Sequence, residues 1–87
     1  MMNFENYPNL AHLEGPLKRY VEHGIMPGSF LTSVLENNLM GAFASADSHN
    51  VNLMKEIAMF MYNEMPSGCW GSRENITNWL RYVEEKS

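Results

Sequence analysis

The sequence contains a single cysteine, Cys69, among its 87 residues. One cysteine excludes an internal disulfide, and a lone thiol is typical of a reducing compartment such as the cytosol. The chain also lacks a long apolar run, because its longest nearly apolar stretch, "IAMFMY" (residues 57–62), is far too short to span a membrane. The N-terminal "MMNFENYPNL" has neither a basic start nor an apolar core. We therefore expect no signal peptide and no membrane association, and a cytoplasmic location.

Basic residues are few as well. Six lysines and arginines stand against ten aspartates and glutamates, which gives a formal net charge of −4. A general nucleic-acid binder neutralises many phosphates, so this balance argues against that class. None of His12, His23 and His49 lies three or four positions from another. Helical ligand spacing and a Cys/His cluster are both missing, so we predict no metal site and no cofactor.

The apolar residues recur at helical spacing, and no segment of four or more alternates cleanly. We predict an all-α, compact single domain of four to five short helices, with residues 1–14 as an irregular N-terminal segment and residues 15–87 as the helical domain. A chain of this size buries only roughly 60–65% of its unfolded surface, so its stability is marginal without further support. Homo-oligomerisation is one such support, and we expect an oligomer.

Turn-forming residues divide the chain into these helices. The first is predicted to begin at Pro16 and to end at Gly24, and the second to begin with Ser29 as its N-cap. The pair at 37–38, Asn-Asn, is either a break or a polar turn of one longer helix, and the apolar row that continues beyond it favours a kinked helix. A further helix runs from about residue 48 or 50 to about 64–66, and the last has Ser72 as its N-cap.

Two loops share one pattern. "PGSF" (27–30) and "WGSR" (70–73) each place Gly-Ser at the start of a predicted helix beside an aromatic ring. A helix N-terminus offers unpaired N–H groups to an anion, an arginine can grip a phosphate or carboxylate, and an aromatic ring can stack on a flat ligand. A small anionic, nucleotide-like ligand would suit this set, although Gly-Ser before a helix is more often ordinary capping. The predicted ligand-binding residues are Gly28, Ser29, Phe30, Trp70, Gly71, Ser72 and Arg73, with Lys18 and Arg19 as secondary candidates because they form an adjacent basic pair.

The helix around residues 54–65 is rich in methionine, which fills irregular gaps in cores and also makes adaptable contact surfaces. Core filling accounts for Met54, Met61 and Met65, whereas Met59, with Phe60 and Tyr62 beside it, is harder to bury in a monomer. This helix is therefore a second candidate surface, for self-association or for a partner protein. No constellation of residues demands catalysis, so we predict a non-enzyme.

The segments "GIMPGSFLTSVLENNLMGAFASAD" (24–47) and "YNEMPSGCWGSRENITNWL" (62–80) carry a resemblance. They resemble short proteins of bacteriophages and prophages with the pattern G-I-x-P-G-S-F-L, then V-L-x-N-x-L, then Y-N-x-x-P-x-x-x-W-G-S, over most of the chain from about Gly15 to Leu80. The resemblance implies no particular activity, cofactor or site residue. It implies an accessory role in an infected bacterial host, including interference with host defence or regulation.

The two function hypotheses differ in their partner. In the first, the protein sequesters a small anionic nucleotide-like ligand, and so counters host defence signalling. In the alternative, it inhibits or redirects one host protein through the Met-rich helix or the Trp70 loop. Trp70 itself is predicted first as a plug over the core and second as the wall of a binding site.

Overall fold

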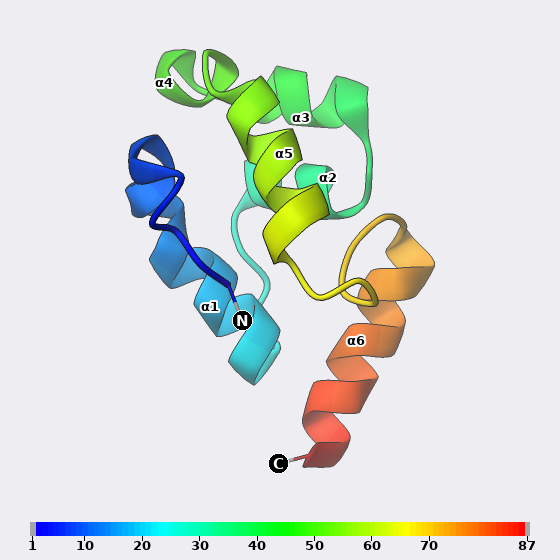
Figure 1. Ribbon diagram of the computed structural model, residues 1–87. Coiled ribbons are helices and arrows are strands. Elements are labelled where there is room, and N and C mark those ends of the chain that lie inside the picture. The colour runs from blue at the N-terminus through cyan, green and yellow to red at the C-terminus, as the bar shows by residue number, and fades with distance from the viewer. Residues whose placement is uncertain (1, 87) are drawn as a thin grey trace.

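The computed structural model describes residues 2–86, and every regular element among them is helical (Figure 1). The elements in chain order are the 3₁₀-helix η1 (Pro8–Leu13) and the α-helices α1 (Glu14–His23), α2 (Ser29–Leu35), α3 (Leu39–Ser45), α4 (Ser48–Val51), α5 (Met54–Glu64) and α6 (Arg73–Lys86). The all-α prediction is confirmed. The described residues form six α-helices where four to five were predicted, because two of the predicted helices are each divided by a turn.

The first division lies at the Asn-Asn pair, where the prediction of one kinked helix is wrong. Asn37 adopts a left-handed φ of 62°, which ends α2. Asn38 then starts α3 as its N-cap, and its Oδ1 accepts a hydrogen bond from the Gly41 amide at 3.0 Å. Asparagine is among the few residues that tolerate the left-handed region and also cap helices, so this pair produces a full break.

The second division separates α4 from α5, where the sequence predicted a single helix. The N-cap of α4 is Asp47, not the predicted Ser48 or Asn50, and its Oδ1 accepts from the Asn50 amide at 2.7 Å. After one turn the chain bends at Asn52 and restarts as α5 at Met54. Helix α1 also begins earlier than predicted, at Glu14, but it ends as predicted at Gly24, whose φ of 68° forms a left-handed C-cap.

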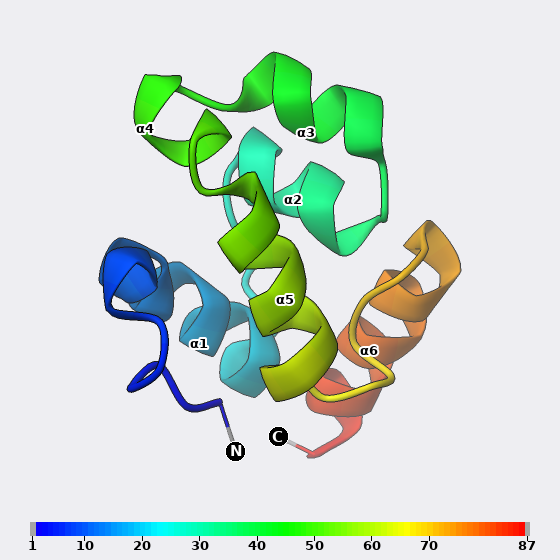
Figure 2. The same cartoon turned by 45° about the horizontal axis from the view of Figure 1, so that its top comes forward.

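Helix α5 lies at the centre of the molecule, with α1 on one side, α6 on the other and the α2–α3 pair beyond one end (Figures 1 and 2). Its Ile57, Phe60 and Met61 are buried. Phe60 also contacts two aromatic rings of the N-terminal segment, at centroid distances of 4.3 Å to Phe4 and 5.2 Å to Tyr7. The remaining side chains of the buried core cluster come from the other helices and from connecting segments: Leu10, Leu13, Leu17, Tyr20, Val21, Phe30, Leu31, Leu35, Ala42, Leu53, Met65, Cys69 and Ile76.

The buried Leu10 and Leu13 belong to η1, within the segment predicted to be irregular. The division of the chain at residue 15 stays a prediction. Helix α6 is held against α1 by Trp79, whose Nε1–H donates to the Val21 carbonyl at 3.2 Å. The 65–72 connection is itself attached to the end of α2, because the Gly71 amide donates to the Leu35 carbonyl at 2.8 Å.

Candidate functional site

The "PGSF" loop starts α2, but its serine does not have the predicted capping role. Gly28 is the N-cap residue, and Ser29 is the first residue of the helix and is exposed. No side chain caps this end. The Thr32 hydroxyl instead donates back to the Pro27 carbonyl at 3.1 Å. Phe30 points into the core and is 8% exposed. The ring of Phe30 therefore belongs to the hydrophobic core.

The "WGSR" loop is closed by its own hydrogen bonds. Ser72 caps α6 as predicted, and its Oγ accepts from the Asn75 amide at 3.1 Å. The Asn75 side chain donates to the Trp70 carbonyl at 2.9 Å, and the Gly71 amide donates to the Leu35 carbonyl at 2.8 Å. Gly71 has a φ of 112°, a conformation that favours glycine. The loop is therefore fixed to the last residue of α2.

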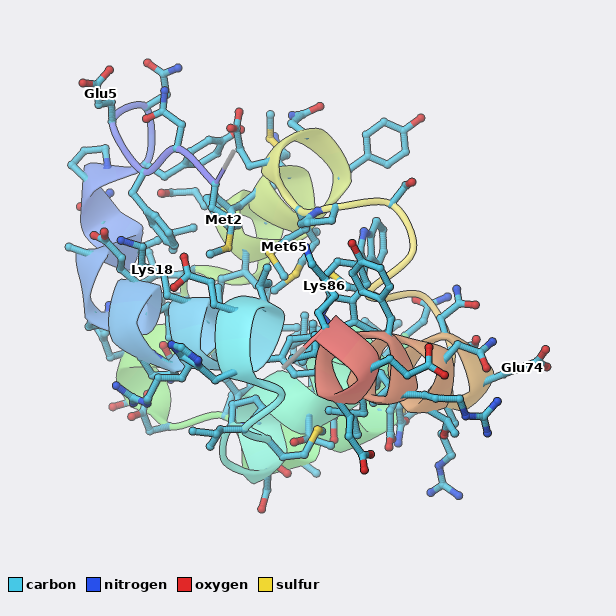
Figure 3. All side chains as sticks on the ribbon, turned by 90° about the horizontal axis from the view of Figure 1, so that it is seen from below. Met2, Glu5, Lys18, Met65, Glu74 and Lys86 are labelled. Atoms are coloured by element: carbon cyan, nitrogen blue, oxygen red, sulfur yellow. The ribbon has the colours of Figure 1, made fainter. Side chains whose placement is uncertain are left out.

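These bonds place the two loops at opposite ends of α2. A seven-residue helix is about 10 Å long, so the "PGSF" start and the "WGSR" loop are separated by about the length of α2. Arg73 lies beside Glu36, with 3.5 Å between Nε and Oε2, and its side chain is 86% exposed. Lys18 pairs with Glu14 along α1 at 3.8 Å, and Arg19 is exposed on the same helix. Figure 3 shows Lys18 and the first turn of α6, marked by Glu74, on opposite sides of the molecule.

Cys69 lies directly before Trp70 and is completely buried. Its carbonyl accepts a hydrogen bond of 2.7 Å from the hydroxyl of Tyr20, which is also completely buried. Burial raises the pKa of the Cys69 thiol to about 12. Burial, with a smaller contribution from Cys69, raises the pKa of Tyr20 well above its usual range. At neutral pH the thiol is protonated and shielded, so this cysteine holds structure and is not an available nucleophile.

A pocket of about 280 Å³ lies where the break between α2 and α3 faces α5 and Trp70. We call it the α3–α5 pocket. It is lined by Ser33, Val34, Asn37, Asn38, Leu39, Ala42, Met54, Ile57, Ala58, Met61, Tyr62 and Trp70. No described residue of this lining is charged, and its three polar side-chain types are the neutral serine, asparagine and tyrosine.

The turn at the mouth of this pocket is set by local geometry. Gly41 packs so closely on Asn38 that an added Cβ would lie 2.5 Å from the Asn38 Nδ2 atom. A side chain at this position would displace the Asn38 side chain from its capping position. Gly41 therefore leaves the room that Asn38, a residue of the pocket lining, needs to cap α3.

Exposed apolar side chains surround the mouth. Among the lining residues, Tyr62 is 80% exposed and Leu39 is 63% exposed. Met40, the next residue of α3, is 79% exposed and lies outside the lining. Met59, predicted to be hard to bury, is also exposed, whereas Met61 and Met65 are buried as predicted. Trp70 is half-buried, packs against the core and forms one wall of the pocket.

Among the residues that line the pocket, Trp70 was predicted as a site residue from the sequence, whereas those of α3 and of the Asn-Asn turn were not. Their signal was present, because an Asn-Asn pair can end one helix and cap the next. The apolar row across the pair favours one continuous helix. For that reason neither the turn nor the pocket beside it was predicted.

Within residues 2–86, no helix is both long enough and apolar enough to cross a membrane. The same described residues contain no group of three or more His, Cys, Asp or Glu side chains arranged around a common metal position. Comparison of the chain with protein-family models, with curated proteins and with solved structures finds no match.

Proposed function

We propose that this protein is an interaction module that takes an apolar side chain of one partner protein into the α3–α5 pocket. The observation that supports the proposal is the pocket itself, an uncharged hollow of about 280 Å³ with exposed apolar residues at its mouth. It combines the Met-rich helix and the Trp70 loop, which are the two surfaces from which the sequence analysis predicted protein binding.

The lining favours a neutral, apolar occupant. A carboxylate or phosphate placed there would lose its hydration without meeting a cation, because no charged side chain lines the pocket. The volume of about 280 Å³ lies just below the roughly 300–1,000 Å³ typical of small-molecule pockets. One large aliphatic or aromatic side chain therefore suits the space better than a nucleotide.

The exposed apolar residues at the mouth of the pocket, which we call the rim, favour a protein as the partner. Leu39 and Tyr62 line the pocket and remain largely exposed, and exposed apolar surface beside a hollow is typical of interaction sites. An anchor residue in a pocket, surrounded by contacts that exclude water, is the usual arrangement of an interaction hot spot. We infer that the partner contributes one anchor to the pocket and flanking apolar residues to the rim.

The finer predictions rest on the sequence alone. A small anionic ligand at the "PGSF" and "WGSR" helix starts, homo-oligomerisation, and a cytoplasmic location in a bacterial host stay predictions. An accessory or anti-defence role in a bacteriophage rests on the resemblance stated above.

The α3–α5 pocket is tested by filling it. Ala58 is exposed and lines the pocket, so Ala58→Phe should occupy the space without disturbing the core. Ala11→Phe, at an exposed alanine of η1, is the matched control. A random dodecapeptide library is selected on the wild-type protein with counterselection on Ala58→Phe. The expected peptides share a large apolar anchor and bind wild type and Ala11→Phe equally.

Methionine-methyl NMR then locates the bound peptide. The methyl signals of Met54 and Met61, which line the pocket, should shift, while that of Met26, which does not line it, should stay in place. Selected peptides without an apolar anchor, or binding unaffected by Ala58→Phe, would overturn the proposal. A parallel titration with AMP and a cyclic dinucleotide tests the alternative prediction of an anionic ligand. If such a ligand binds as predicted, its binding should be lost in Arg73→Ala.

A further inference from the structure

Two histidines from separate parts of the chain meet on the surface, away from the α3–α5 pocket. His12 lies on η1 and His49 on the single turn of α4, and their ring centroids are 4.8 Å apart with 55° between the ring planes. Both side chains are exposed. Positions 12 and 49 are far apart in the sequence, so helical spacing does not pair these two histidines.

The distance between the rings fits shared coordination of a metal ion. A Zn–N bond of about 2.1 Å places the centre of an imidazole about 3.2 Å from the metal. Two such rings have centres about 4.5 Å apart at a ligand–metal–ligand angle of ~90°, and about 5.2 Å apart at ~109°. The observed 4.8 Å lies between these values.

Asn50 sets the tautomer of one ring. The Nε2 atom of His12 lies 2.8 Å from Oδ1 of Asn50. An amide oxygen only accepts, so Nε2 carries the proton and Nδ1 of the neutral ring keeps its lone pair. Metal-ligating histidines commonly donate their second N–H to an oxygen acceptor in this way, which orients the ring and raises its basicity.

The turn that carries His49 and Asn50 is itself fixed. Asp47 accepts from the Asn50 amide at 2.7 Å, and the Asn52 side chain donates to the Ser48 carbonyl at 2.9 Å. These bonds hold the backbone of the turn that carries His49 and Asn50 before any ligand arrives. Little backbone entropy would therefore be lost when the two rings are bridged.

We propose that His12 and His49 form a two-imidazole site for a divalent transition-metal ion, with His12 coordinating through Nδ1 and Asn50 orienting it. Imidazole suits zinc, copper and nickel, whereas magnesium prefers oxygen ligands. The described residues offer no third His, Cys, Asp or Glu ligand, so water or a partner's side chain completes the shell. The bound ion would join η1 to α4, two segments otherwise linked here by the Asn50 hydrogen bond.

The test titrates the untagged full chain with ZnCl₂ and NiCl₂ and follows metal affinity by calorimetry and thermal unfolding. We expect saturable stabilisation that EDTA reverses and that MgCl₂ does not reproduce. His12→Gln and His49→Gln should each abolish it, while His23→Gln, at an exposed histidine of α1, should bind as wild type does. Asn50→Ala should weaken binding roughly 10- to 100-fold, as expected for a residue that orients a ligand.

Melting in EDTA separates lost metal binding from lost folding, because all variants should then melt near the wild-type temperature. If a histidine variant fails to fold, paramagnetic broadening by Cu²⁺ in wild type replaces it and should centre on His12 and Asn50. The proposal is overturned by no response to either metal, by a response that His12→Gln retains, or by broadening centred on His23.

Discussion

Replacing Tyr20 with phenylalanine tests the contact that holds the Trp70 loop to α1. The aromatic ring stays in the core, and only the hydroxyl that donates to the Cys69 carbonyl at 2.7 Å is removed. Both residues are completely buried, so water does not replace the lost donor. A buried acceptor left without its partner costs about 1–3 kcal/mol. For a domain of this size, each kcal/mol lowers Tm by about 4–8 °C, so a loss of about 2 kcal/mol lowers it by about 8–16 °C.

The assay is thermal and urea unfolding followed by circular dichroism at neutral pH. Tyr82→Phe is the matched control, because Tyr82 is exposed and keeps its ring contact with Trp79, at a centroid distance of 5.1 Å, as phenylalanine. We expect the control to change the free energy of unfolding by less than about 0.5 kcal/mol. If Tyr20→Phe melts with the control, the buried hydrogen bond does not hold the loop and the reasoning fails.

Three further predictions follow from the two Gly-Ser loops and the buried thiol. Ser72→Ala should lower the free energy of unfolding by about 1 kcal/mol because it removes the cap of α6. Ser29→Ala should have almost no effect, because the Ser29 side chain caps nothing. Equal losses of unfolding free energy in the two variants, measured by chemical denaturation, would contradict the assigned caps. Gly71→Ala should cost about 1–3 kcal/mol because its φ is 112°, while Gly28→Ala, with open space around its Cβ position, should change stability by less than about 1 kcal/mol; the same unfolding curves decide. Burial raises the pKa of Cys69 from 9.0 to about 12 in the folded state, so the unfolded chain loses the thiol proton at lower pH than the folded chain does. The contribution of the thiol to the free energy of unfolding is therefore fully present below about pH 9 and is lost as the pH rises towards 12. Urea midpoints from about pH 8 to about pH 11 should therefore fall less steeply in Cys69→Ala than in wild type, and parallel curves would refute the assignment.

The sequence predicted the fold class because its apolar residues follow a helical period throughout. It also predicted the ends that depend on one local residue, such as the left-handed Gly24 and the Ser72 cap. It failed at Asn37, where two local tendencies compete. The apolar row favours a continuing helix, and the side-chain chemistry of asparagine favours a break. The packing of α3 over α2 decides between them, and a short segment of the sequence does not reveal that packing.

The candidate site shows the same limit more strongly. Trp70 could be identified by its unusual setting among turn formers, but its partners in the pocket come from α2, α3 and α5. The meeting of His12 and His49 likewise depends on how η1 packs beside α4. Spacing along the chain reveals residues that share one helix, whereas both of these arrangements join residues from different elements.

The two roles predicted for Trp70, packing over the core and lining a binding site, are compatible with each other. The backbone around it is fixed at three points: the Cys69 carbonyl by Tyr20, its own carbonyl by Asn75, and the Gly71 amide by the Leu35 carbonyl. With the backbone held, one part of the indole packs on the core and another part faces the α3–α5 pocket. The turn formers on either side allow the tight path that these three bonds require. A ring that is already ordered for structural reasons loses little entropy when a partner contacts it, so the structural role favours the binding role.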